Sequence, residues 1–139
     1  MATVRGVGGD VDLPAGFNAK LSGFSFNLEI KTVDTTGFGD EGWMTEEPVC
    51  QRLSGSATGT PIFNVASSTP VPAAIMDSTP DANAATGSIV LTFAPGCTWT
   101  FNGTINQVSG DRGACEKGNI TYNFLHAGGG VVQVWDEMP

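Results

Sequence analysis

Alternation of apolar and polar side chains is the clearest pattern in this chain, and it predicts β-strands. From residue 24 to residue 31 the apolar positions are Phe24, Phe26, Leu28 and Ile30, and the polar ones are Ser25, Asn27, Glu29 and Lys31. A period of two is typical of a strand with one buried face and one hydrated face. The longest alternation runs over residues 97–106, with Thr and Asn on its outer face.

Further extended segments surround these two. Residues 2–13 resemble a hairpin around Gly8-Gly9-Asp10, and residues 51–63, 89–93, 120–124 and 131–135 each have strand character. The glycine run 128–130 is expected to separate the last two strands. With 139 residues, this pattern predicts one domain, an all-β sandwich or barrel of about seven or eight strands.

Residues 64–87 are the least regular part of the chain. Pro70, Pro72 and Pro80 forbid a long helix there. We expect at most one short helix to flank the sheet, and the candidate for it is residues 72–77, with Thr69 as the candidate cap.

An acidic, glycine-containing loop over residues 34–48 joins the first long strand to the next. Its aromatic and methionine side chains are of the types favoured at protein interfaces. We therefore predict an inter-subunit loop made by Phe38, Asp40, Glu41, Trp43, Met44, Glu46 and Glu47. The alternative is that Trp43 folds back onto its own domain.

The charge pattern argues against autonomous binding to nucleic acid. The net charge is −8, and the six Lys and Arg residues are scattered singly, whereas non-specific binding needs clustered cations. An acidic surface instead repels the phosphate backbone. Only 14% of residues are charged, so much of the surface is neutral and suited to packing against copies of itself, although a neutral monomer is the alternative.

The residues offer little support for catalysis. Any Ser/His/Asp triad would need His126, the single histidine, and there is no GxSxG elbow. A pairing of Cys97 or Cys115 with His126 has no supporting pattern. With Cys50, the cysteines number three and lack metal-binding spacing, which indicates free thiols in a reducing compartment. We predict that the protein is not an enzyme.

Metal, cofactor and membrane sites are also not indicated. Asp34, Asp40 and Glu41, or Asp10 with Asp12, could approach one Ca²⁺, but their spacing does not match an EF-hand. Solvated or inter-subunit carboxylates are the preferred interpretation, so no cofactor is expected. No stretch resembles a signal peptide or a membrane helix, so we expect no membrane anchor.

Several of these segments resemble the tail tube (major tail) proteins of long-tailed bacteriophages. The similarity lies in TVDTTGFGDEGW at residues 32–43, SGSATGT at residues 54–60, and the strand-like run over residues 89–124. The resemblance implies a β-sandwich or barrel with one flanking helix, and hexameric rings that stack into a tube. It further implies an acidic, hydrophilic lumen that conducts DNA without tight binding.

The resemblance also assigns roles to residues. The loop over residues 34–50 would reach a neighbouring ring, and the lumen candidates would be Asn27, Glu29, Lys31, Ser54, Ser56 and Thr58. The implied partners are further copies of the chain and other tail proteins, and the implied location is the virion tail, assembled in the host cytoplasm. A capsid decoration or head–tail connector protein is the first alternative, and a β-sandwich ligand-binding module is the second.

Overall fold

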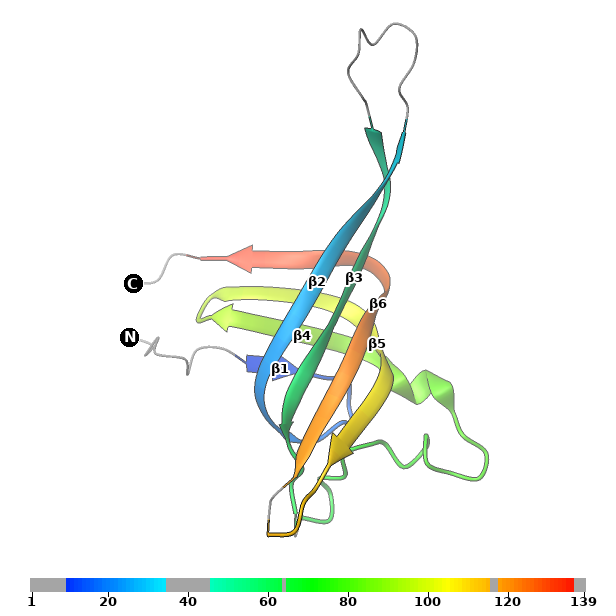
Figure 1. Ribbon diagram of the computed structural model, residues 1–139, viewed down its shortest axis with the longest axis vertical. Coiled ribbons are helices and arrows are strands. Elements are labelled where there is room, and N and C mark those ends of the chain that lie inside the picture. Colours follow the sequence, from blue (N-terminus) through cyan, green and yellow to red (C-terminus); the bar gives the residue numbers. More distant parts are fainter. Residues whose placement is uncertain (1–9, 35–45, 64, 116–117, 137–139) are drawn as a thin grey trace, which may run out of the picture.

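The computed structural model describes residues 10–34, 46–63, 65–115 and 118–136, and it is almost entirely made of strands (Figure 1). A 3-10 helix, η2, is the one helical element of these residues. In chain order the elements are β1 (Asp10–Asp12), β2 (Lys20–Asp34), β3 (Glu46–Thr60), η2 (Ala82–Ala85), β4 (Thr86–Ala94), β5 (Cys97–Asp111) and β6 (Asn119–Trp135). The all-β prediction is confirmed.

The described residues form six strands, fewer than the seven or eight expected. The difference arises mainly at residues 128–130, where the glycine run does not end a strand. Gly128 and Gly129 have φ of 152° and 70°, and β6 continues through them as one strand up to Trp135. Glycine adopts such positive φ without steric cost, so the run bends β6 instead of ending it. The first half of the predicted N-terminal hairpin lies outside the described residues.

All six strands form one antiparallel sheet, in the order β1-β4-β5-β6-β3-β2. The sheet curls so that its two terminal strands, β1 and β2, come close to each other (Figure 1). The long strands β5 and β6 curve through both halves of the fold. A sheet that curls in this way encloses a core between its own faces.

The core lies where β3, β5 and β6 are paired. Small residues on β3 stand directly opposite large ones on β6: Gly55 opposite Phe124, Ala57 opposite Tyr122. Gly55 is half-buried, and the other three residues are buried, Ala57 and Tyr122 fully so. The other buried core residues are Val11, Phe17, Leu53, Ala85, Ile89, Leu91, Phe101, Ile105 and Ile120. Alternating small and large side chains on paired strands fills the interior without voids.

The segment between β3 and β4 differs from its prediction. Residues 72–77 form turns instead of a helix, with Ile75 N donating to Pro72 O at 3.0 Å. The helical turn forms later, at η2, where Asp81 Oδ1 accepts from Asn83 N at 3.0 Å and caps it. The predicted helix is therefore wrong in position, because the capping aspartate lies downstream of the prolines.

Hydrogen bonds from Tyr122 and Asn18 fix this segment to the rest of the fold. Tyr122 Oη donates to Pro70 O at 2.7 Å, while Asn18 Nδ2 donates to Thr69 O at 3.2 Å. Burial of the phenol raises the pKa of Tyr122 to about 12. The loop therefore packs on one side of the sheet and leaves the polar side of β2 and β3 uncovered by its anchoring contacts.

Candidate assembly surface

Residues of β2 and β3 form one part of a polar face of the sheet. Asn27 lies directly opposite Ser54, and Ser25 lies opposite Ser56, with their hydroxyl oxygens 3.0 Å apart. Directly opposed residues of antiparallel strands point to the same side. The register thus brings the predicted lumen candidates onto one face: Asn27, Glu29, Lys31, Ser54, Ser56 and Thr58. Their place in a lumen stays a prediction.

The polar face continues onto β6 and β5, which the sequence interpretation missed. Asn123 on β6 lies between Ser56 and Gln107, and its Nδ2 donates to Gln107 Oε1 at 3.0 Å. Thr121 lies between Thr58 and Ser109 in the same way. The β6 residues could have been found, because they alternate with Ile120, Tyr122 and Phe124. The β5 residues were hidden by a bulge between Ile105 and Gln107, which reverses the alternation.

Charge on the described polar face is balanced. Glu29 lies directly opposite Arg52, Lys31 follows on the same side of β2, and Asp111 ends the face on β5. Most residues between these positions carry hydroxyl or amide groups; Leu125, which lies directly opposite Ser54, is an apolar exception. The described part of this face therefore shows no excess of carboxylates, and the net charge of −8 arises elsewhere in the chain.

The hairpin of β2 and β3 extends beyond the rest of the molecule as an arm, defined here as residues 28–34 and 46–53 (Figure 1). Glu46 and Glu47 of the predicted inter-subunit loop lie in β3 at its far end and are exposed. Thr32 Oγ1 donates to Glu46 Oε2 at 3.4 Å. The remaining predicted loop residues lie outside the described part of the chain: Phe38, Asp40, Glu41, Trp43 and Met44.

The apolar side of β2 is not buried as the alternation predicted. Phe24 packs against the core, but exposure rises to 43% at Phe26, 50% at Leu28 and 59% at Ile30. Phe26 still contacts Trp99 edge to face, with ring centroids 4.9 Å apart. The prediction of a buried face is therefore wrong beyond the base of the arm, because β2 extends past the core that would cover its apolar side.

An opening separates the arm from the second half of β6. β3 and β6 are paired only from Ser54 opposite Leu125 to Gly59 opposite Ile120. Beyond Leu125, β6 turns away from β3 and continues to pair with β5 alone, along the first half of that strand. We refer to the opening between residues 46–53 of β3 and residues 126–135 of β6 as the fork.

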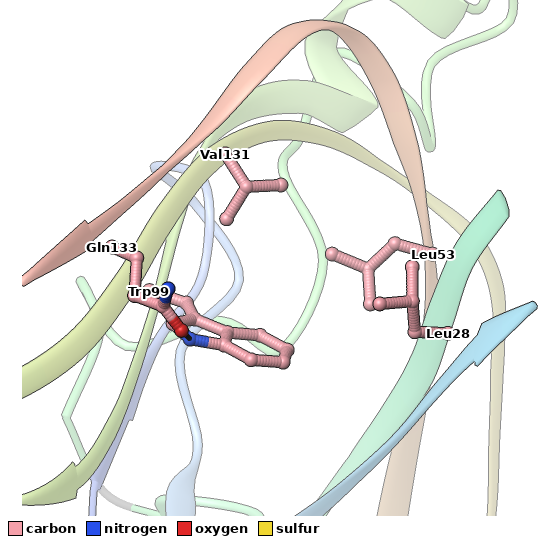
Figure 2. A pocket seen from close by; sticks show the side chains of 5 residues that line it. All are labelled: Leu28, Leu53, Trp99, Val131 and Gln133. Atoms are coloured by element: carbon pink, nitrogen blue, oxygen red, sulfur yellow. Dashed lines mark hydrogen bonds between the residues drawn. The ribbon is translucent and has the colours of Figure 1, made fainter. Parts of the chain in front are cut away.

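The fork is lined mainly by apolar side chains. Figure 2 shows Leu28 and Leu53 on one wall and Val131, Trp99 and Gln133 on the other. Trp99 Nε1 donates to Gln133 Oε1 at 2.8 Å, which fixes the indole at the edge of the opening. A larger hollow of about 580 Å³ adjoins it. Such a surface favours packing against another apolar surface.

His126 lies in that larger hollow and has an unsatisfied ring nitrogen. Its Nε2 is buried and has no hydrogen-bond partner among the described residues. The ring centroid lies 6.1 Å from that of Phe101. The three cysteines are free: Cys97 is buried, and Cys50 and Cys115 are exposed. The described residues hold no group of three His, Cys, Asp or Glu that could bind a metal ion.

Comparison with known proteins identifies the fold. No family model matches the chain, and no curated protein matches it. Within the described residues, no helix is long and apolar enough to cross a membrane. The solved structures with a similar fold include two GTA particles. The first is the tail of an empty GTA particle refined with C6 symmetry: TM-score 0.61, 15% identity, 83% of this chain and 82% of that chain.

The second similar structure is the virion of a native gene transfer agent (GTA) particle. It has a TM-score of 0.67 at 14% identity and covers 94% of this chain and 98% of that chain. At these identities the likeness is one of fold. The tail-tube-like fold that the sequence resemblance implied is therefore confirmed over most of the chain.

Proposed function

We propose that this chain is a structural subunit of a virion tail tube, in which six copies form a ring and rings stack into a tube. The observation that carries the proposal is the fold, which matches a chain of a GTA tail solved with C6 symmetry over 83% of this chain. Its role is assembly, and no catalytic step is assigned to it. The location would be the virion tail, after assembly in the host cytoplasm.

The free edges of the sheet support closure into a ring. In the described residues, β2 has a strand neighbour only on its β3 side, and β5 pairs with β4 no further than Thr104. The strands β5-β6-β3-β2 alternate in direction, so β5 of a second copy added beside β2 continues the antiparallel pattern. A closed ring of such units removes edges that would otherwise pair without control.

The polar face would then line the lumen. Its hydroxyl and amide groups hydrate readily, and its few charges are balanced around Glu29 and Arg52. DNA binds non-specifically where clustered cations displace its counterions, and this face has no such cluster among the described residues. A hydrated wall of this kind would let DNA pass without tight binding. The part of the lumen wall made by these described residues would be hydrophilic and nearly neutral, and an acidic lumen stays a prediction.

The arm would supply contacts between subunits. Its apolar side chains are exposed in the single chain, and its far end carries Glu46 and Glu47. Residues 35–45, with Phe38, Asp40, Glu41, Trp43 and Met44, would extend this contact surface toward a neighbouring ring. Other tail proteins would cap the ends of such a tube.

The mass of the assembly tests the proposal. Sedimentation velocity over a series of concentrations should show a species of six times the 14.4 kDa chain and larger multiples of it. A protein that sediments as a monomer at every concentration would refute the proposed function. Stable trimers would instead favour a capsid decoration protein.

A further inference from the structure

We propose that residues 1–9, the segment that precedes β1, dock over an aromatic hollow of the same copy and cover it. The aromatic hollow is defined by the five side chains that line it: Phe26, Phe93, Trp99, Gln133 and Trp135. The inference goes beyond the proposed function, because it concerns each single copy and does not depend on how copies assemble. Three observations support it: the exposure of the aromatic rings, the point at which the segment joins the described fold, and the charge around the hollow.

Phe93 lies at the centre of the rings that surround the hollow. Its ring centroid lies 5.4 Å from that of Phe24, 5.6 Å from Phe26, 5.2 Å from Trp99 and 5.5 Å from Trp135. The rings come from four strands, β2, β4, β5 and β6. The hollow measures about 550 Å³, and Phe26 and Trp135 remain 43% and 60% exposed beside it. Aromatic surface of this kind favours contact with an apolar or a cationic side chain.

The segment joins the described fold at the edge of this hollow. β1 begins on the side of the molecule where β6 ends (Figure 1). β1 pairs with β4 with Asp10 opposite Thr92, and the next residue of β4 is Phe93. One further pair of the ladder would therefore bring Gly9 beside the central ring. Glycine has no side chain, so it would leave space for that ring.

The length and the residue pattern of the segment fit the hollow. Nine extended residues span about 30 Å, whereas the ring centroids of Phe93 and Trp135 are 5.5 Å apart. Continued alternation would place positions 9, 7 and 5 on the side of the buried Val11. Position 9 is a glycine, so Val7 and Arg5 would be the side chains directed toward the rings. A tethered segment acts at a high effective concentration, which favours the segment of the same copy.

Charge around the hollow is complementary to the segment. Arg5 is the single charged residue of the segment, whereas residues 65–111 and 118–136 contain no Lys or Arg. Asp136 directly follows Trp135 and is exposed, and its backbone N–H donates at 3.0 Å to a carbonyl of the β4–β5 turn. A guanidinium can stack on an indole and pair with a neighbouring carboxylate. Arg5 would thus supply the cation for a surface whose nearby charges are carboxylates.

Removal of the Arg5 charge tests the assigned contact. The readout is the internal disulfide of a Val7→Cys, Gln133→Cys protein, at equilibrium in a glutathione buffer. Arg5→Gln should lower the yield of that disulfide by about two- to fivefold, because it removes the cation that contacts the indole. Lys20→Gln removes the same charge at an exposed position at the start of β2 and should leave the yield unchanged. Equal yields from the two charge variants would overturn the role of Arg5.

Disulfide trapping in dilute solution tests the docking itself. In a Cys50→Ser, Cys115→Ser background, Val7→Cys with Gln133→Cys should yield a monomer with an internal disulfide on mild oxidation. Val7→Cys with Ser88→Cys, at an exposed position on β4 outside the hollow, is the control and should yield little. Peptide mass mapping identifies the joined cysteines, the buried native one included.

Two results of the trapping experiment would overturn the proposal. Equal yields of internal disulfide from the test protein and its control would show that the segment lies elsewhere, as in a hairpin that folds back along β1. Dimers joined through positions 7 and 133, in place of the monomer, would show that the segment of a second copy covers the hollow. Both readouts come from the single chain, so a failure to form rings or tubes would remove the tail-tube function and leave this contact intact.

Discussion

Gly55 on β3 lies directly opposite Phe124 on β6, and the Phe124 ring occupies space that any side chain at position 55 would need. The same position also adjoins the backbone oxygen of Ser25 on β2. Three strands therefore meet at one glycine, at the point where the polar face and the core lie back to back.

Gly55→Val should destabilise the fold strongly. Its branched side chain would overlap backbone of β2 as well as the Phe124 ring, and backbone cannot move aside as a side chain can. Overpacking of this kind costs about 1–3 kcal/mol or more. Urea unfolding of the isolated chain should show the loss. Ser54→Val, next to it on the opposite face, should change stability by less than about 0.5 kcal/mol; equal losses would mean that Gly55 is not tightly packed.

Tyr122 should titrate well above an ordinary tyrosine. It is the single tyrosine of the chain, so ultraviolet absorbance during an alkaline titration reports on it alone. Burial raises its pKa from 10.0 to about 12. The folded state holds the proton more tightly than the unfolded state. Its contribution to stability is therefore complete below pH 10.0 and is lost as the pH rises toward about 12.

The matched variant for this titration is Tyr122→Phe. It removes the hydrogen bond to Pro70 O and should cost about 1 kcal/mol near neutral pH. It should also flatten the fall in stability above pH 10.0. An unshifted tyrosine titration in the parent protein would show that the phenol is accessible to water.

His126→Phe should stabilise the fold of the single chain. It removes a buried ring nitrogen that lacks a hydrogen-bond partner among the described residues, so the free energy of unfolding should rise by about 1 kcal/mol. Chemical denaturation measures the change. A variant that folds less stably than the parent would show that the imidazole contributes to the packing of the folded chain.

Glu29→Lys should turn the proposed lumen into a DNA-binding surface. It would place a third cation beside Arg52 and Lys31 and remove the opposing carboxylate. Fluorescent DNA should then be retained by assembled tubes, with an affinity that falls as salt rises. Ser88→Lys, on β4, is the matched control. If neither variant retains DNA, or both retain it equally, Glu29 does not line the lumen.

Much of the architecture could be predicted from alternation alone. The run over residues 97–106 specified both faces of the first part of β5, with Phe101 and Ile105 buried and Asn102 and Asn106 exposed. The Ser and Thr positions of β3 likewise identified its polar face. Local periodicity succeeds in such places because each side chain faces either the core or water.

The errors arose because the alternation of apolar and polar residues does not show where a strand extends beyond the core, where a strand ends, or where a bulge reverses the alternation. Leu28 and Ile30 follow a buried-face pattern, but the arm extends past the core, so they are exposed in the single chain. The glycine run was expected to end a strand and instead bends β6. The bulge before Gln107 hid the part of the polar face that lies on β5. Apolar side chains on the part of a strand that extends beyond the core are exposed in the single chain, and this exposure indicates a partner surface.

Electron microscopy tests the central claim most directly. Negative-stain images of the purified chain, taken over a range of concentrations, should show rings with six-fold symmetry that stack into hollow tubes. The fold likeness to a GTA tail with C6 symmetry leads to that expectation. Uniform monomers at every concentration, or particles without six-fold symmetry, would contradict the tail-tube account.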